Sequence, residues 1–323
     1  MNADPVSEPR GRVGAIERAS AALDTLIAPQ AGIEKLADGF IWSEGPVWVR
    51  EGRYLLLSDV PANKMYRWSE EDGLSVFLDP SGHASLAPSG FREPGSNGLV
   101  RGPGNSILMA DHGNRAIARL DLATRAKTFL ATHYEGRRFN SPNDLVLGPD
   151  GSIYFTDPPY GLDGLNSSPL KELGFNGVYK IAPGGAVELL EKGMSFPNGI
   201  ILSPDGRTLY VANSDPDRAV IMAFDLEASG RLAKGRVFAD MTKLAKSGLP
   251  GLPDGMAVDK AGNLFATGPG GVHIFTPTGE RLGRIDTGTA VANCAFGEDG
   301  KTLFLASNHM LARLRTRTTG FNY

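Results

Sequence analysis

Hydrophobic and polar residues alternate along much of the chain in short segments that are separated by turn-forming residues. Pairs of these segments flank a tight turn, as in the stretch SPNDLVLGPDGSIYFTD, which begins at Ser141. Alternation with a period of two predicts half-buried strands, and an Asp-Gly pair between two such strands predicts a hairpin. The pattern therefore predicts an all-β fold.

The hairpin recurs six times, each time with a short polar opening before its first strand. From the opening residue to the end of the second strand the distance is 14 or 15 residues in every unit, whereas successive openings lie 39 to 56 residues apart. A constant core with variable connections is typical of a repeat whose loops differ. The openings are Glu44-Gly45, Asn97-Gly98, Asn143-Asp144, Asn198-Gly199, Asp254-Gly255 and Asn293-Cys294.

Two further strands follow most of the hairpins, which gives four strands per unit. Six radially repeated units of four strands predict a six-bladed β-propeller with four-stranded blades. The last unit lacks a fourth strand, while the strand-like segment 32–40 precedes the first unit without a partner. We expect this segment to pair with the strand at 310–316 and to close the ring, because closure removes two exposed sheet edges.

The chain is expected to contain an N-terminal extension, residues 1–31, and a single propeller domain, residues 32–323. Within the extension, the stretch GAIERASAALDTLIA has apolar residues at helical spacing and predicts a short helix packed outside the ring. No composition shift or low-complexity segment divides the remainder.

Composition narrows the possible functions. The 323 residues are 41% hydrophobic and 21% charged, with a formal net charge of -3, so neither a nucleic-acid partner nor a membrane partner is expected. The single Cys294 excludes an intrachain disulfide framework. Without an apolar leader the protein is expected to be cytoplasmic, or periplasmic if a leader was removed. Near the C-terminus, three arginines at strand spacing predict a solvated strand face: Arg313, Arg315 and Arg317.

Propeller geometry predicts where the polar openings meet. The first strand of each blade lines the central channel, so its opening residue lies at the channel mouth, and the end of the antiparallel second strand returns to the same face. Carboxylate and amide oxygens gathered there favour a hard divalent cation, with Ca²⁺ preferred and Zn²⁺, Mg²⁺ or Mn²⁺ possible. The candidate strand-end residues are Asp59, Asp111, His112, Asp157 and Asn213.

A turn-forming role is the alternative for each opening, because Asn, Asp and Gly are common before strands. Six openings in register weaken that alternative. Glu44 weakens it most, since a turn alone favours Asn or Asp at its position. Asn97 and Asn293 are expected to be structural.

Four motifs, SEGPVW, SPNDLV, FPNGI and PDGMAVD, in this order and spacing, resemble the SMP-30/gluconolactonase/LRE family of six-bladed propellers, bacterial gluconolactonases above all. The resemblance covers the chain from about residue 40. It implies one divalent metal, held by Glu44, Asn198 and Asp254, and no organic cofactor. It implies that Asn143 binds substrate or joins the metal. Ser141 departs from the animal members, which carry a substrate-binding Arg two residues before this Asn.

The resemblance implies metal-dependent hydrolysis of a sugar lactone, D-glucono-1,5-lactone or a related aldonolactone, to the aldonic acid. Asp254 is the expected catalytic base. Two alternatives stay open, namely hydrolysis of phosphotriesters or other lactones at the same metal and a non-catalytic, calcium-stabilised binding propeller. The residues expected to bind the hydroxyls of a small sugar lactone are His112, Asn143, Asp157, Tyr160 and Asn213.

Overall fold

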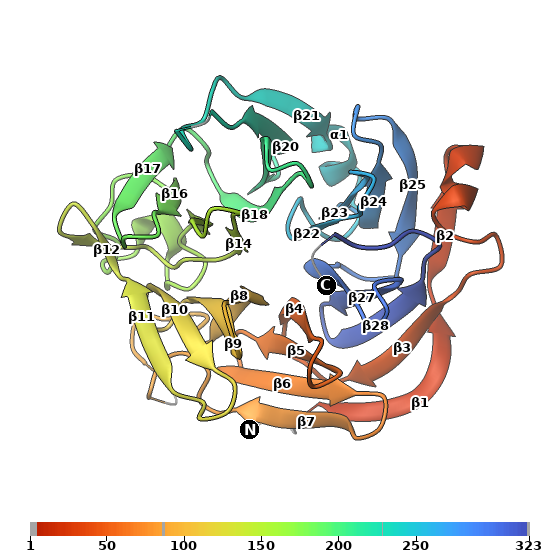
Figure 1. Cartoon of the computed structure of the whole chain (residues 1–323), viewed down its shortest axis with the longest axis horizontal. Helices are drawn as coiled ribbons and strands as arrows, with labels where there is room; N and C mark the ends of the chain where they lie inside the picture. The colour runs from red at the N-terminus through yellow and green to blue at the C-terminus, as the bar shows by residue number, and fades with distance from the viewer. Residues whose placement is uncertain (1–4, 86–87, 228, 322–323) are drawn as a thin grey trace.

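The computed structural model describes residues 5–85, 88–227 and 229–321. Within these ranges, six antiparallel sheets of four or five strands stand in a ring around a central axis (Figure 1). Each sheet is one blade, and the first strand of its repeated hairpin is the innermost strand. The predicted six-bladed propeller is confirmed.

The first three blades follow one another along the chain. Blade 1 contains β4 (Ser43–Val49), β5 (Tyr54–Asp59), β6 (Lys64–Ser69) and β7 (Gly73–Leu78). Blade 2 contains β8 (Ser96–Arg101), β9 (Ser106–Asp111), β10 (Ala116–Asp121) and β11 (Lys127–Ala131). Blade 3 contains β14 (Leu145–Leu147), β15 (Ile153–Asp157), β16 (Gly177–Ile181) and β17 (Val187–Glu191). Between blades 2 and 3 a small hairpin pairs β12 (His133–Tyr134) with β13 (Arg137–Arg138).

Blades 5 and 6 each take a further strand from the N-terminal part of the chain. Blade 4 contains β18 (Pro197–Leu202), β19 (Thr208–Asp215), β20 (Arg218–Asp225) and β21 (Arg236–Asp240). Blade 5 contains β22 (Met256–Val258), β23 (Leu264–Gly268), β24 (Gly271–Phe275) and β25 (Arg281–Asp286), with β2 (Ala15–Arg18) outside. Blade 6 contains β26 (Asn293–Gly297), β27 (Thr302–Ser307), β28 (Met310–Arg315) and β3 (Ile33–Asp38), with β1 (Val6–Val13) outside.

The blades are held together by apolar side chains that point from both faces of each sheet. Six clusters of buried hydrophobic residues occur among the described residues, and each one joins two neighbouring blades. Between blades 6 and 1, for example, Trp48 stacks on Phe304 with ring centroids 5.7 Å apart. Each sheet is covered on both faces, which explains why many strands are buried along their whole length.

The ring closes between the two ends of the chain, as predicted. Strand β3 pairs antiparallel with β28, with Met310 opposite Asp38 and Arg313 opposite Glu34. An N-terminal strand therefore completes the sheet formed by the last three strands of the chain. Figure 1 shows this junction where the red and blue segments meet.

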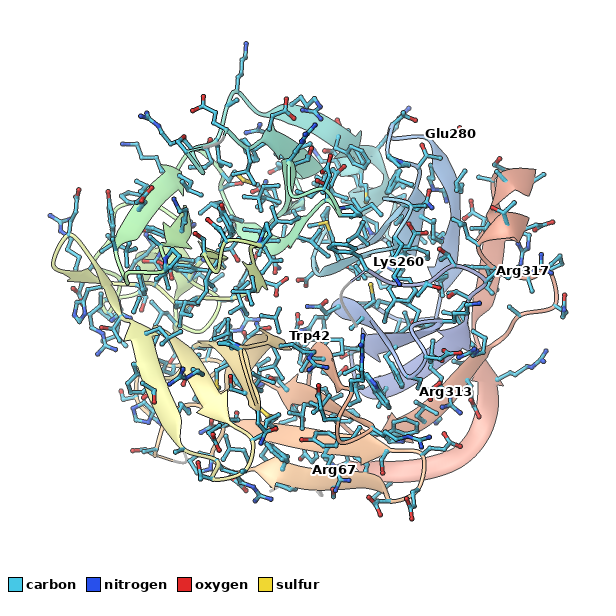
Figure 2. All side chains as sticks on the ribbon, in the orientation of Figure 1. Trp42, Arg67, Lys260, Glu280, Arg313 and Arg317 are labelled. Atoms are coloured by element: carbon cyan, nitrogen blue, oxygen red, sulfur yellow. The ribbon has the colours of Figure 1, made fainter. Side chains whose placement is uncertain are left out.

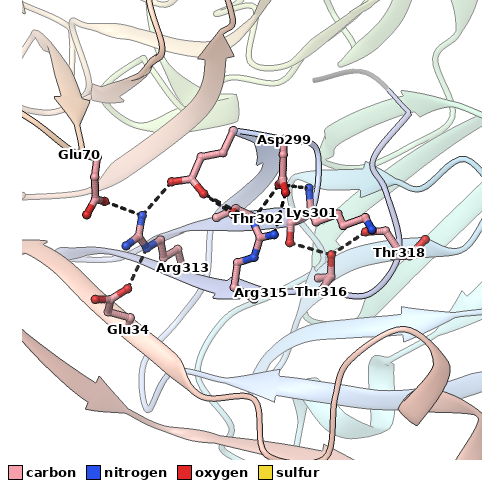
Figure 3. Close-up of polar contacts among 10 residues, drawn as sticks. Glu34, Glu70, Asp299, Lys301, Thr302, Arg313, Arg315, Thr316 and Thr318 are labelled. Atoms are coloured by element: carbon pink, nitrogen blue, oxygen red, sulfur yellow. Dashed lines mark hydrogen bonds and ion pairs between the residues drawn. The ribbon is translucent and has the colours of Figure 1, made fainter.

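Arg313 secures this junction, and its side chain is not solvated as the sequence pattern predicted. Its side chain is only 13% exposed and forms three ion pairs at 2.8 Å, with Glu34, Glu70 and Glu298 (Figure 3). The three carboxylates belong to β3, the β6–β7 turn and the β26–β27 turn. The guanidinium also lies 5.4 Å from the ring centroid of Trp68. One side chain thus ties blade 6 to blade 1.

The N-terminal extension contains more strand and less helix than its sequence pattern predicts. The expected helix is limited to the 3-10 helix η1 (Ala21–Thr25), capped by the Ser20 side chain. The preceding segment forms β2, which pairs with the outer strand of blade 5 and so satisfies an open sheet edge. The other helices in the part of the chain that the structure describes are η2 (Leu165–Ser167) and α1 (Thr242–Ala245). Across the described ranges, no helix has the length and apolar character required to span a membrane.

Candidate functional site

The polar openings lie where the inner strands begin, as the propeller geometry predicts. Hydrogen bonds between side chains of neighbouring blades show that they meet at one end of the channel. In chain order they come from β4, β8, the turn before β14, β18, the turn before β22 and β26: Glu44, Asn97, Asn143, Asn198, Asp254 and Asn293.

Glycine after the opening residue lets adjacent blades approach closely. A Cβ on Gly45 would lie 2.1 Å from the carbonyl oxygen of Asn97, and one on Gly199 would lie 2.0 Å from that of Asp254. The register between β4 and β5 also shifts after Glu44, which is a β-bulge of the kind that re-aims a side chain. The Gly in these openings is therefore required by the packing of the ring.

Three amide side chains form a hydrogen-bonded arc along one side of the ring. Asn97 Nδ2 donates to Asn143 Oδ1 at 2.8 Å, and Asn143 Nδ2 donates to Asn198 Oδ1 at 2.5 Å. Asn198 Nδ2 then donates to the Ser214 hydroxyl at 3.0 Å. Each amide is thereby oriented, and Asn198 Oδ1 keeps a second lone pair. The Oδ1 atom of Asn97 is buried without a hydrogen-bond partner among the described residues.

Two carboxyl groups complete the ring on the opposite side. Glu44 is 2% exposed and accepts hydrogen bonds from the Gly45 amide at 2.9 Å and from Asn293 Nδ2 at 3.2 Å. Burial raises the pKa of Glu44 to about 7. Burial also raises the pKa of Asp254 well above its usual value, and the negative charges of Glu44 and Asp144 add to that effect. The two carboxylates are thus costly to keep ionised without a nearby positive charge.

The donor set fits a hard divalent cation. The ring offers only oxygen donors. They are the mutually repelling carboxyl groups of Glu44 and Asp254, the oriented amide oxygens and the unpartnered oxygen of Asn97. Such an all-oxygen environment suits Ca²⁺. Among the described residues, no group of three or more His, Cys, Asp or Glu side chains is placed to hold a metal. A cation at this site would therefore depend on Asn oxygens as well as on carboxylates.

A pocket of about 690 Å³ opens above the ring. Its two sides differ in chemistry. Blades 2 to 4 supply a polar side, and the segments that enter blades 5, 6 and 1 supply an apolar side. The polar side includes Arg92, Glu93, Tyr160 and Ser214, and the apolar side includes Ile41, Trp42, Leu252 and Val291. Figure 2 shows Trp42 close to the centre of the ring.

Asp157 and Asn213, two of the expected substrate contacts, do not line this pocket. Asp157 is fully buried, and its Oδ2 accepts a hydrogen bond from the Asn140 amide at 2.8 Å. Asn213 accepts from the Phe196 amide at 3.0 Å and donates to the Arg218 carbonyl at 2.9 Å. Both side chains hold the loop that leads into an inner strand. Their role in this structure is to position the openings.

His112 lies behind the ring and does not line the pocket either. It is fully buried, with Nε2 3.3 Å from Asn143 Oδ1 and Nδ1 3.6 Å from Glu93 Oε2. Burial lowers the pKa of His112 to about 4, so the imidazole is neutral near pH 7. The structure thus places His112 against two pocket residues and out of reach of a ligand.

Tyr160 does line the pocket, and Ser141 explains its position. The Ser141 hydroxyl donates to the Pro158 carbonyl at 2.7 Å and accepts from the Gly161 amide at 2.9 Å. The Tyr160 ring stacks on Phe196 with centroids 5.8 Å apart. Ser141 therefore holds the loop that presents Tyr160.

Sequence reasoning missed several pocket residues, among them Trp42, Arg92 and Glu93. Glu93 stands four residues before Asn97, in the loop that connects blades 1 and 2. A carboxylate so close to an opening is a weak signal in the sequence, because the loop's path depends on distant contacts. One such contact is the Gly161 carbonyl, which accepts hydrogen bonds from the amides of both Arg92 and Glu93.

Comparison with known proteins places this ring in a family. The sequence profile described as the SMP-30/Gluconolactonase/LRE-like region matches residues 42–309. The chain belongs to this family. The gluconolactonase of Zymomonas mobilis is 48% identical over 95% of this chain and 88% of its own. The pentonolactonase XacC of Haloferax volcanii is 26% identical over 79% of this chain and 77% of its own.

A solved family structure supports the same fold assignment. The gluconolactonase of Xanthomonas campestris is 32% identical, with a TM-score of 0.81 over 96% of this chain and 98% of the other. Both the sequence and the structural relatives of this chain therefore include enzymes named for action on sugar lactones.

Proposed function

We propose that this protein is a lactonase that hydrolyses a sugar lactone, D-glucono-1,5-lactone or a related aldonolactone, with the help of a divalent cation. The family relatives support the lactone as substrate class. The observation that carries the proposal is the ring itself, where the carboxyl groups of Glu44 and Asp254 and oriented amide oxygens form the floor of a pocket large enough for a sugar ring. Ca²⁺ is the metal that this oxygen-rich donor set favours.

Glu44, Asn143, Asn198 and Asp254 would hold the cation. When bound, the cation supplies polarisation of the lactone carbonyl and stabilises the charge that develops on its oxygen. Asn143 and Asn198 are fixed by their mutual hydrogen bond, so their oxygens keep one orientation throughout the reaction. This preorganisation reduces the cost of reorienting dipoles as charge develops.

Asp254 is the proposed catalytic base. Glu44 is 2% exposed and already accepts hydrogen bonds from Gly45 and Asn293, whereas the side chain of Asp254 is partly exposed on the pocket wall. Asp254 can therefore reach a water molecule beside a bound lactone. It takes a proton from that water as the water oxygen bonds to the carbonyl carbon. The ring C–O bond then breaks, and its oxygen gains a proton.

Tyr160 is proposed to contact the substrate, since it lines the pocket on a loop held by Ser141. Asn143 has a second proposed role beside the metal, because its side chain lies on the same pocket floor. The other residues that the sequence predicted to bind substrate are His112, Asp157 and Asn213. We propose that they act from behind the pocket, by holding the loops and amide side chains that line it.

The test is hydrolysis of gluconolactone, other aldonolactones and a phosphotriester by the purified protein, each with chelator and after restoring Ca²⁺. We expect rapid, chelator-sensitive hydrolysis of an aldonolactone and little hydrolysis of the phosphotriester. Lactone hydrolysis that is unaffected by complete metal removal would contradict the metal's role. A phosphotriester as the best substrate would contradict the substrate class.

A further inference from the structure

Glu93 is a buried carboxyl group on the pocket wall with no role in the proposed metal site. Its side chain is 11% exposed and lines the pocket beside Asn97 and Tyr160. One carboxylate oxygen lies 3.0 Å from the Arg92 guanidinium, and the other lies 3.6 Å from Nδ1 of His112. That Nδ1 atom has no hydrogen-bond partner among the described residues.

The loop that carries Glu93 is fastened to the loop that carries Tyr160. The amides of Arg92 and Glu93 both donate to the Gly161 carbonyl, at 3.0 and 3.3 Å. The Tyr160 hydroxyl lies near Ser214 and Asn198 but has no partner in hydrogen-bonding geometry among the described residues. The Glu93 carboxylate and the Tyr160 hydroxyl can therefore each form further hydrogen bonds. They lie on one wall of the pocket, on two loops that are hydrogen-bonded to each other.

Arg92 differs from its neighbour in exposure. Its side chain is 53% exposed, so it lies at the rim of the pocket while Glu93 lies deeper. Together they present a carboxylate, which accepts hydrogen bonds, next to a guanidinium, which donates them. Such charged groups make the strongest hydrogen bonds to hydroxyl groups.

The facing wall is apolar and contains Ile41, Trp42 and Leu252. A sugar lactone has hydroxyl groups around its ring and C–H bonds on its faces. A pocket with one charged wall and one apolar wall matches that distribution. A lactone without hydroxyl groups would leave the charged wall unpaired.

We propose that the Arg92–Glu93 pair recognises adjacent ring hydroxyl groups of the substrate, and so selects polyhydroxylated lactones over lactones that lack hydroxyls. Glu93 accepts from one or two hydroxyls, and Arg92 donates to a hydroxyl oxygen at the rim. His112 acts as a positioning residue, since it is buried behind Glu93 and Asn143. This inference rests on the proposed lactonase function and names the determinant of its specificity.

The experiment compares kcat and KM for D-glucono-1,5-lactone and δ-valerolactone, which has the same ring size and no hydroxyls. Glu93→Ala is expected to lower kcat/KM for gluconolactone about 10- to 100-fold, mainly through KM, since it removes hydrogen bonds to a charged group. For δ-valerolactone the loss should stay below about threefold. Glu93→Gln should lie between, because the amide still bonds a hydroxyl. Arg92→Ala should shift selectivity in the same direction by less.

The control is Glu280→Ala, an exposed Glu at the outer edge of the ring (Figure 2), which should change neither substrate's kinetics. Melting temperatures of all variants show whether each has folded. The lactams of the same two rings, gluconolactam and δ-valerolactam, are tested as inhibitors. Their Ki values repeat the comparison of hydroxylated and unhydroxylated rings without requiring turnover of the poorer substrate. Glu93→Ala is expected to raise the Ki of gluconolactam and not that of δ-valerolactam.

Equal losses for both lactones, or unchanged selectivity in a folded Glu93→Ala variant, would overturn the inference while leaving the lactonase function standing. A wild-type protein that hydrolyses neither lactone in the presence of Ca²⁺ would instead overturn the proposed function. The two failures are therefore distinguished by the wild-type measurement.

Discussion

The two ends of the central channel are built from the same inner strands but differ in chemistry. At one end, the opening residues form a polar ring beneath a pocket of about 690 Å³. Toward the other end, the same strands line a cavity of about 420 Å³ with apolar side chains from all six blades, among them Val47, Leu99, Val146, Met256 and Phe296. Only one or two residues along a strand separate the two environments.

This difference helps to explain why the carboxyl groups near the ring have raised pKa values. The apolar side chains below the ring offer no hydrogen-bond donors to its carboxyl groups. Burial raises the pKa of Glu44 in the ring to about 7, and it raises the pKa of Asp144, which lines the lower cavity, to about 8. The apolar half thus makes an ionised ring costly unless a cation is present. Substitutions that change one end of the channel and leave the other intact test whether the two ends act separately.

The largest effect is expected for Asp254→Asn, which retains the side chain's shape and an oxygen but removes its basicity. If Asp254 is the base, kcat should fall by roughly 10²–10⁴-fold even when Ca²⁺ saturates the variant. Steady-state kinetics across a Ca²⁺ titration measure this. Near-complete recovery of activity at high Ca²⁺ would show that Asp254 is a ligand only.

Glu44→Gln should weaken Ca²⁺ binding by about one to three orders of magnitude, because one of two neutralising charges is lost. Titration calorimetry measures the affinity. Glu280→Gln is the control, since it removes the same charge from an exposed side chain at the outer edge of the ring. An equal effect in both variants would remove Glu44 from the metal site.

At the apolar end, Phe296→Ala should lower the free energy of unfolding by about 3–5 kcal/mol, since it removes a large buried side chain and leaves a cavity. Phe296 is 3% exposed and packs edge-to-face on Phe265 at 5.2 Å. Urea denaturation measures the loss. The activity per folded molecule should stay unchanged, and a large drop in kcat would show that the two ends are coupled.

The smallest expected effect concerns acid stability, which should depend on a group outside the channel. His273 is fully buried in blade 5, where Nε2 donates to the Pro269 carbonyl at 2.9 Å and Nδ1 accepts from Arg281 at 3.2 Å. Burial lowers the pKa of His273 to about 4. His273 therefore binds a proton more readily in the unfolded chain than in the folded protein. Its contribution to the free energy of unfolding is present above about pH 6.5 and is lost as the pH falls toward 4.

His273→Gln retains a donor and an acceptor but cannot titrate. Between pH 7.5 and pH 4.5, it should lose about 2 kcal/mol less stability than the wild type does. Denaturation curves across this range in saturating Ca²⁺ provide the comparison. Identical pH profiles would assign the acid sensitivity to other groups.

Much of the fold could be predicted because its signals are local. Alternating strands, tight turns and constant hairpin lengths indicate blades without knowledge of their neighbours. The closing strand was found because one sheet lacked a partner. The fifth strands β1 and β2 were missed, since β2 has residues at helical spacing and its conformation is decided by the open edge of β25.

The site residues could be predicted only where they occupy the same position in each repeat of the hairpin. Glu44, Asn143, Asn198 and Asp254 share one position in the hairpin, so a single geometric argument brings them together. Asp157 occupies another repeated position, but it is buried outside the pocket, where its Oδ2 accepts a hydrogen bond from the Asn140 amide. Such a local hydrogen bond is not visible in the sequence.

The sequence by itself determined the number of blades, the closing strand and the polar ring, because each follows from spacing along the chain. The tertiary structure alone decided which polar groups face the pocket. Glu93 reaches the wall because its loop is tied to Gly161, far away in sequence, and His112 is turned inward by its contacts with Asn143. Loop paths depend on contacts between distant segments, and those contacts carry no periodic signal.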